Sequence, residues 1–331
     1  MVSREGTVLW YDVDATVVPL AGGKSASSLR PASSDVVVRN ILTNIMNLHT
    51  GFVKDVWLWR GQYGFGDLVP SMHGRVLGTP GLRACEANVQ WATRQLLRYA
   101  RSCQVDRFED VVLPDLALLA YLQHHGAATP LMDVSVDPLV AIWMAVNPGT
   151  LAPPNGSGES YVFAIAAPRE KLKLGAMDSR PYWDPDTGSA SVAGQLGPEL
   201  FWYEAPDISP RLRAQRGSFV IGSFQHAPTA KRPTAVISGL VQATPTSASY
   251  AERWRAMMTQ IAGTAHPQGP PRRPGTMVRF RIPAAYFGRV NKWLEQRIGL
   301  TRASVYPVPW HSPLIEEFAQ CFGRKRVIDW P

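Results

Sequence analysis

The 331-residue chain is long enough for one large domain or two of ordinary size, and 45% of its residues are hydrophobic, as in a typical globular protein. No run of about 18 apolar residues is free of charges or helix breakers, which argues against a membrane-spanning helix. The N-terminus carries acidic residues and lacks an apolar core, so we expect no signal peptide.

The three cysteines, Cys85, Cys103 and Cys321, are odd in number and lie far apart in the sequence. That spacing favours reduced thiols in a cytoplasmic protein over a disulfide framework or a zinc site. We therefore expect a cytoplasmic protein with no metal site and no membrane partner.

The net charge is +8 and the pI is near 9.6. Between Tyr250 and Arg302, ten lysines or arginines stand against two acids, Glu252 and Glu295. Such a segment can bind a nucleic acid backbone. An ordinary solvated basic surface has the same composition, so both interpretations stay open.

The N-terminal part, residues 1–50, predicts an arm and a helix. A β-like run from Thr7 to Val18 precedes a loop rich in Gly, Ser and Ala, and Asp35 can cap a helix that ends near Leu48. The segment from Lys54 to Arg60 alternates as a strand does, with Val56 and Leu58 on one face and Trp57 and Trp59 on the other. The glycines and the proline of residues 61–70 predict a loop.

Helices and strands are then interspersed without regular βαβ spacing. Helices are predicted over Leu82–Ala100, Pro114–His125, from Pro138 onward, over Tyr286–Ile298 and over Pro313–Phe322. Strands are predicted over Tyr161–Ala166, Glu199–Glu204, Ser218–Ser223 and Met277–Ile282. The segment Pro228–Ser249 predicts a loop. This order predicts a single mixed α+β domain over residues 51–331.

Three sequence blocks carry a resemblance. The first is Trp59-Arg60-Gly61-Gln62, and the second is Gln123-His124-His125-Gly126 followed by Thr129, Asp133 and Ser135. The third is Pro210-Arg211-Leu212 followed by Gln215-Arg216-Gly217-Ser218-Phe219. In this order they resemble the FRG-domain family, over roughly Asp55 to Gln320. The chain departs from that pattern at Pro130, where relatives have an arginine, so the five donors of that guanidinium are missing here.

A second, weaker resemblance is to the arginine-type ADP-ribosyltransferases. They also begin with an aromatic-Arg-Gly strand, followed by a strand with Ser or Thr and a third with Glu or Gln. The resemblance implies a split β core with flanking helices, NAD as substrate, and Arg60, Ser135 and Gln215 as catalytic residues. Glu199 and Glu204 are rivals of Gln215, because a carboxylate stabilises positive charge better than an amide.

The chemistry of this set is coherent. A planar guanidinium can make two parallel hydrogen bonds to the pyrophosphate of NAD, and Gly61 lets a ligand approach the backbone closely. A carboxylate or amide can orient the ribose 2′-hydroxyl and the incoming nucleophile. The candidate NAD-binding residues are Arg60, Gly61, Gln62, His124, His125 and Asp133.

Each candidate also has a structural interpretation. Arg60 can form a salt bridge or stack on Trp57. The two histidines can cap or charge-complement the end of their helix, and Asp133 can cap the helix at Pro138 or accept a hydrogen bond from Arg60. Ser135 is also a plausible turn residue.

The leading hypothesis is an enzyme that transfers ADP-ribose from NAD to a macromolecule, with nucleic acid favoured over protein as acceptor. Its role would be that of a toxin with an antitoxin or immunity partner, or of a phage-defence effector. The alternatives are a non-catalytic module that binds nucleic acid or a nucleotide, and a structural protein in which the three blocks only pack the core.

Overall fold

The computed structural model describes residues 10–14, 34–50, 56–64, 68–148, 158–167, 173–184, 186, 190–196, 200–229, 232–237, 277–307 and 313–324. The fold is mixed α+β, as predicted. The chain divides into two compact units. Unit 1 contains Met1–Phe65, Ser135–Ala167 and Gln242–Val305, and unit 2 contains Gly66–Val134, Pro168–Val241 and Tyr306–Pro331.

The strands of unit 1 lie in the order β1 (Trp10–Asp14), β12 (Met277–Pro283), β6 (Glu159–Ala166) and β2 (Trp57–Tyr63). β1 is parallel to β12, and the other two pairings are antiparallel. β2 begins at Trp57, three residues later than the strand predicted over Lys54–Arg60. It continues through Gly61, which the sequence pattern had placed in a loop. Pairing with β6 as far as Tyr63 and Ser160 holds this glycine in the strand, and local propensity carries no information on that pairing.

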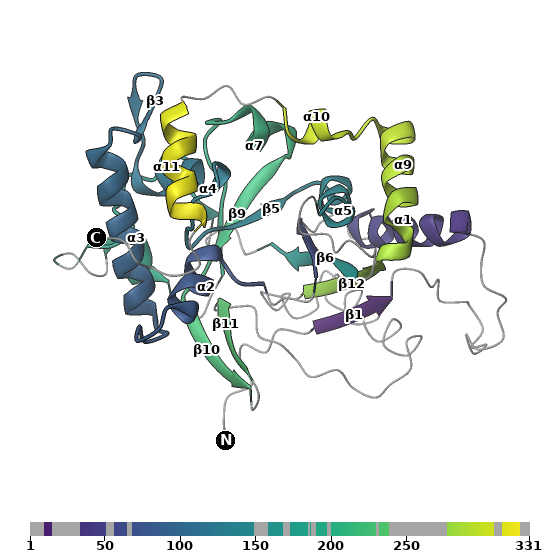
Figure 1. Ribbon diagram of the computed structural model, residues 1–331, viewed down its shortest axis with the longest axis horizontal. Coiled ribbons are helices and arrows are strands. Elements are labelled where there is room, and N and C mark those ends of the chain that lie inside the picture. The colour runs from purple at the N-terminus through teal and green to yellow at the C-terminus, as the bar shows by residue number, and fades with distance from the viewer. Residues whose placement is uncertain are drawn as a thin grey trace, which may run out of the picture. The chain divides into compact units, whose positions relative to one another are not determined.

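The helices of unit 1 are α1 (Ser34–Thr50), α5 (Pro138–Val146), α9 (Phe287–Ile298), which follows the 3₁₀ turn η5 (Ala284–Tyr286), and α10 (Arg302–Val305). α1, α5 and α9 lie together on one side of β6 and β12 (Figure 1). Their apolar side chains form one core with Trp57, Trp59, Val162 and Phe280. The predicted helices from Asp35, Pro138 and Tyr286 are thus confirmed, and their predicted starts, with the ends predicted for the first and the last, agree within about two residues.

Unit 2 contains a second group of strands and most of the remaining helices. Its strands β5 (Met132–Ser135, the last residue belonging to unit 1), β9 (Gly217–Ile221), β8 (Phe201–Tyr203) and β7 (Lys173–Leu174) are successive neighbours. Two antiparallel pairs accompany them, β3 (Arg107–Phe108) with β4 (Val111–Val112) and β10 (Phe224–Thr229) with β11 (Arg232–Ile237).

The helices of unit 2 are α2 (Ser71–Gly78), α3 (Glu86–Ser102), α4 (Asp115–His124), α6 (Val192–Gln195), α7 (Pro210–Ala214) and α11 (Pro313–Arg324). α4 is buried on almost every side, which agrees with its apolar sequence. β11 and the last two residues of β10 lie within the segment predicted as a loop, so that prediction is wrong for residues 228–229 and for Arg232–Ile237. The β-branched residues Thr234, Val236 and Ile237 of β11 suit a strand, and the prolines that suggested a loop are compatible with a two-stranded edge.

In the part of the chain that the structure describes, no helix has both the length and the apolar character needed to cross a membrane.

Candidate functional site

The two faces of β2 carry different chemistry. A Cβ built at Gly61 would lie 1.9 Å from the carbonyl oxygen of Ala141 in α5, so the Cβ direction of Gly61 faces that helix. Side chains alternate along a strand, so Trp57 and Trp59 face α5 as well, and both belong to that core. Arg60 and Gln62 therefore lie on the opposite face. The close approach of a ligand to the Gly61 backbone stays a prediction. The space into which a side chain at this position would point is occupied by α5.

Register joins Arg60 to residues far away in the sequence. Arg60 pairs with Phe163, which pairs with Arg279, and Gln62 pairs with Tyr161, which pairs with Arg281. Residues directly opposite one another share a face of the sheet. We call this set the arginine face: Arg60, Gln62, Tyr161, Phe163, Arg279 and Arg281. Neighbouring strands are about 4.8 Å apart, which puts the backbones of Arg60 and Arg279 roughly 10 Å apart.

The arginines of this face have different surroundings. Arg279 is buried, with its guanidinium carbon 4.8 Å from the ring centre of Tyr161. Arg281 donates to Glu159 at 2.8 Å, and the Tyr161 hydroxyl donates to the same carboxylate at 2.7 Å.

Two aspartates of β1 stand in register with the arginines of β12. Asp12 is the partner position of Arg279, and Asp14 is that of Arg281. Each arginine of β12 therefore has an aspartate at the paired position of the neighbouring strand. Arg60 lies two strands further along the sheet, half-buried, with Phe163 beside it in register.

Ser135 pairs with Trp59, which puts its side chain on the α5 face and not on the face of Arg60. Its Oγ accepts a hydrogen bond from the backbone N–H of Asp137 at 2.9 Å, so it is a turn residue. Asp137 in turn accepts from Leu139 N–H at 2.8 Å and caps α5. The expectation that Asp133 caps this helix is wrong. A catalytic role for Ser135 stays a prediction, and this register weighs against it.

In unit 2 the second sequence block forms a hydrogen-bond network. Gln123 Nε2 donates to Asp133 Oδ2 at 2.8 Å, and Thr129 Oγ1 donates to Gln123 Oε1 at 2.7 Å. The same hydroxyl accepts from Leu131 N–H at 3.2 Å, and Ser71 Oγ accepts from Thr129 N–H at 3.0 Å. These hydrogen bonds connect the end of α4 to β5. They explain the presence of Gln, Thr and Asp in this block by a structural role.

His124 is buried and uncharged at neutral pH. Burial lowers its pKa to about 4; the nearby Asp133 carboxylate, 4.0 Å from Nδ1, raises the pKa by a smaller amount, and Arg211 lowers it. An uncharged imidazole cannot complement a helix dipole, which removes that explanation for this residue. His125 is the C-cap of α4, and its ring meets Tyr121 edge to face at 5.0 Å.

The third block contacts the second within unit 2. Arg211 Nη1 donates to the carbonyl of His124 at 2.8 Å, and the Phe219 ring lies 5.9 Å from the His124 ring. The Arg211 guanidinium also lies 4.4 Å from the ring centre of Tyr306. Gln215 is buried at the end of α7.

The predicted site residues thus fall into two sets. Arg60, Gly61, Gln62 and Ser135 belong to unit 1, and His124, His125, Asp133 and Gln215 belong to unit 2. Their convergence on one cleft stays a prediction. Of the two rival glutamates, Glu204 forms an ion pair with Lys173 at 2.8 Å, and Glu199 lies outside the described residues.

The sequence interpretation treated Arg279 and Arg281 only as members of a basic segment. Residues 250–276 of that segment lie outside the described part of the chain. The signal for the arginine face was the alternation within Met277–Pro283, where Arg279 and Arg281 alternate with the apolar Val278, Phe280 and Ile282. That pattern predicts a shared face, but not which strand carries the neighbours.

No grouping of three or more histidines, cysteines or acidic residues suited to a metal ion occurs among the residues for which positions are given. Residues 55–150 match the model of the FRG domain. The match contains the first two sequence blocks, so the predicted FRG resemblance is confirmed for this part of the chain. No curated protein and no solved structure matches the chain.

Proposed function

We propose that the arginine face binds the diphosphate of NAD through Arg60 and that the protein transfers ADP-ribose to an acceptor macromolecule. The observation that supports the binding step is the row of Arg60, Phe163 and Arg279 on the sheet face opposite α1, α5 and α9. A guanidinium holds a phosphate by two parallel, charge-assisted hydrogen bonds, and Arg281 and Gln62 add further donors on the same face.

In the transfer step the bond between nicotinamide nitrogen and ribose C1 breaks, and its electron pair leaves with nicotinamide. An oxygen or nitrogen of the acceptor forms the new bond to C1 and loses its proton to solvent. The oxocarbenium-like centre requires a group that orients the nucleophile by position and charge. Gln215 is the candidate for that role, and this part of the proposal rests on the resemblance to ADP-ribosyltransferases alone.

The test is NAD turnover, measured as nicotinamide release and as transfer of label to RNA, DNA or protein. Arg60→Gln removes the guanidinium and is expected to lower turnover roughly 10- to 100-fold, since a hydrogen bond to a charged group contributes about 1.5–3 kcal/mol. Arg60→Lys keeps the positive charge but lacks the planar guanidinium. Its turnover should therefore lie between those of the wild type and Arg60→Gln. Arg98→Gln, an exposed arginine on α3 of unit 2, is the matched control. If neither NAD binding nor turnover is detected, the proposal fails.

One observation favours a second candidate, a module that binds a nucleotide without reaction. Ser135, the expected catalytic partner of Arg60, lies on the other face of the sheet. Titration calorimetry separates the two candidates: NAD binding that is lost in Arg60→Gln, without any nicotinamide release, would support the binding module.

A further inference from the structure

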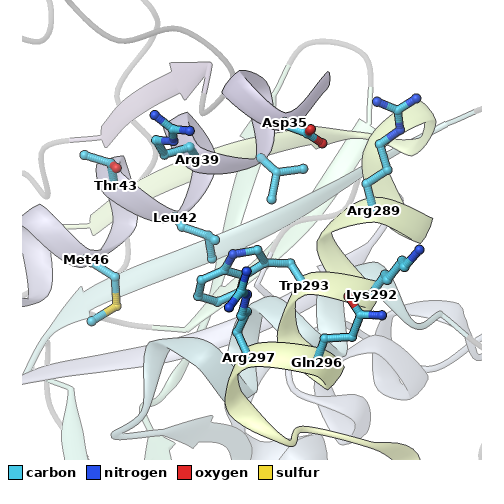
Figure 2. Close-up of a pocket in the computed structure, with 11 residues that line it drawn as sticks. Asp35, Arg39, Leu42, Thr43, Met46, Arg289, Lys292, Trp293, Gln296 and Arg297 are labelled. Carbon is cyan, nitrogen blue, oxygen red and sulfur yellow. The ribbon is translucent and has the colours of Figure 1, made fainter. Parts of the chain in front are cut away.

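A basic pocket lies between α1 and α9 of unit 1, away from the arginine face. Its volume is about 840 Å³, within the range of small-ligand and substrate sites. Figure 2 shows side chains from both helices around this space, with Trp293 between them. The residues that line it are Asp35, Val38, Arg39, Leu42, Thr43, Met46, Arg289, Lys292, Trp293, Gln296 and Arg297. We call it the α1/α9 pocket.

The lining has a marked excess of positive charge. Arg39, Arg289, Lys292 and Arg297 are all exposed, and Asp35 is the single acid. Within the described parts of the chain, none of the four cations lies within salt-bridge distance of a carboxylate. Four solvent-facing cations around one concavity favour a ligand with several negative charges.

The cations of α9 are spread over one face of the helix, because five positions between Lys292 and Arg297 turn these two residues about 140° apart around the helix axis. Arg289, Lys292 and Arg297 are separated by three and five positions, with Trp293 and Gln296 between the last two. At 1.5 Å per residue, Arg289 and Arg297 are about 12 Å apart along the helix axis. Arg39 adds a cation from α1 (Figure 2). The charges are therefore distributed along the pocket, which suits a ligand with repeated phosphates better than one with a single anionic group.

The centre of the pocket is apolar. The half-buried Trp293 lines it together with Leu42 and Met46 of α1, and Figure 2 shows Leu42 pointing toward the Trp293 ring. An aromatic ring among cations is the combination by which proteins hold single-stranded nucleic acids, because bases stack on the ring while the phosphates meet the cations. A duplex hides its bases, and a membrane surface would favour protruding apolar side chains over recessed ones.

We propose that the α1/α9 pocket binds single-stranded nucleic acid, with phosphates on Arg39, Arg289, Lys292 and Arg297 and a base on Trp293. The further step, that the bound nucleic acid is the acceptor of ADP-ribose, rests on the proposed function. The binding of nucleic acid to the pocket does not depend on it, because binding requires neither NAD nor Arg60.

The test measures fluorescence anisotropy of a labelled single-stranded oligonucleotide of about ten nucleotides, without NAD, over a range of salt concentrations. Four phosphate contacts predict a log–log salt slope of about −3 for the wild type. The double variant Arg289→Gln/Arg297→Gln is expected to bind more weakly, with a slope shallower by roughly 1.4. Trp293→Leu is expected to weaken binding roughly tenfold while leaving the slope nearly unchanged.

The matched control is Arg98→Gln/Arg302→Gln, which removes the same charge from exposed positions outside the pocket lining and should bind like the wild type. Thermal melting monitored by circular dichroism shows whether each variant is folded. Equal affinity and slope in the pocket variants and the control would overturn the proposal. So would tighter binding to duplex or to anionic vesicles, or displacement of the oligonucleotide by free NAD at stoichiometric concentration.

Arg60→Gln separates this proposal from the proposed function. It should bind the oligonucleotide like the wild type while its NAD turnover falls roughly 10- to 100-fold. Retained oligonucleotide binding without any turnover in the wild type contradicts only the transferase proposal. Turnover without oligonucleotide binding contradicts only the α1/α9 pocket.

Discussion

Gly61 of β2 and Ala141 of α5 approach so closely that a Cβ at Gly61 would lie 1.9 Å from the Ala141 carbonyl oxygen and 2.7 Å from the Ala145 nitrogen. Both neighbours are backbone atoms of a helix, which cannot move aside as a flexible side chain can. The glycine after Arg60 therefore allows α5 to pack on the sheet. Because α5 packs there, the face of β2 that carries Arg60 is fixed as the opposite one.

Gly61→Ala should consequently destabilise unit 1 by about 1–3 kcal/mol or more, the usual cost of forcing extra atoms into a packed core. Urea denaturation gives the free energy of unfolding. Gly74→Ala in α2 is the control, because its Cβ would meet nothing closer than 3.9 Å and alanine is the better helix former. An unchanged midpoint for Gly61→Ala would mean that α5 and β2 are further apart than described.

The start of α5 gives a second prediction. Asp137 caps the helix through Leu139 N–H at 2.8 Å, and Ser135 Oγ accepts from Asp137 N–H. Asp137→Ala is expected to cost about 1 kcal/mol, the typical loss for an N-cap, while Asp137→Ser should retain most of the stability. Thermal melts of the three proteins check the order. Equal loss in the alanine and serine variants would show that the carboxylate acts by charge and not as a cap.

The pH dependence of stability follows from two buried histidines. Burial lowers the pKa of His124 to about 4 and that of His73 to about 3, against an ordinary value of 6.5. Below about pH 6.5 these two histidines bind protons in the unfolded chain but not in the folded chain. Their contribution to the free energy of unfolding is therefore fully present above that pH and is lost as the pH drops toward 4. His124 alone contributes up to about 3 kcal/mol of this loss.

Urea denaturation between about pH 7 and about pH 5 measures this slope. His124→Asn removes one titrating group and should make the slope shallower by up to about 1.4 kcal/mol per pH unit, whatever the variant does to absolute stability. A variant with the slope of the wild type would show that His124 is charged, or accessible to water, in the folded protein.

Sequence patterns predicted most of the helices because periodic apolar residues and proline or glycine at the ends are local signals. They missed α2, whose eight residues include Gly74 and have no capping side chain. This helix is held by the burial of Met72 and Val76 in the core of unit 2, which is a tertiary effect. Asp133 was one of the possible caps of α5 in the sequence, but the structure has Asp137, which directly precedes Pro138 as an N-cap must.

The candidate site was predictable only in part, for a similar reason. Arg60 was recognised from its position beside Gly61 in a strand. The neighbours Phe163 and Arg279 are more than 100 residues away and depend on strand register, which the sequence of β2 does not contain. Likewise, the contact of Arg211 with the His124 carbonyl joins two sequence blocks whose order alone gave no indication of it.

The last prediction concerns Thr129, which is buried and connects Gln123 to Leu131 through one hydroxyl. Thr129→Val keeps the shape but removes the acceptor of the Leu131 N–H and the donor to Gln123 Oε1. Leaving a buried polar group unsatisfied costs about 1–3 kcal/mol. Thr129→Ser retains the hydroxyl and loses only a methyl group, so it should be the more stable of the two variants. If apolar packing were the role of this residue, the order would be reversed, and equilibrium unfolding of the two variants decides between these roles.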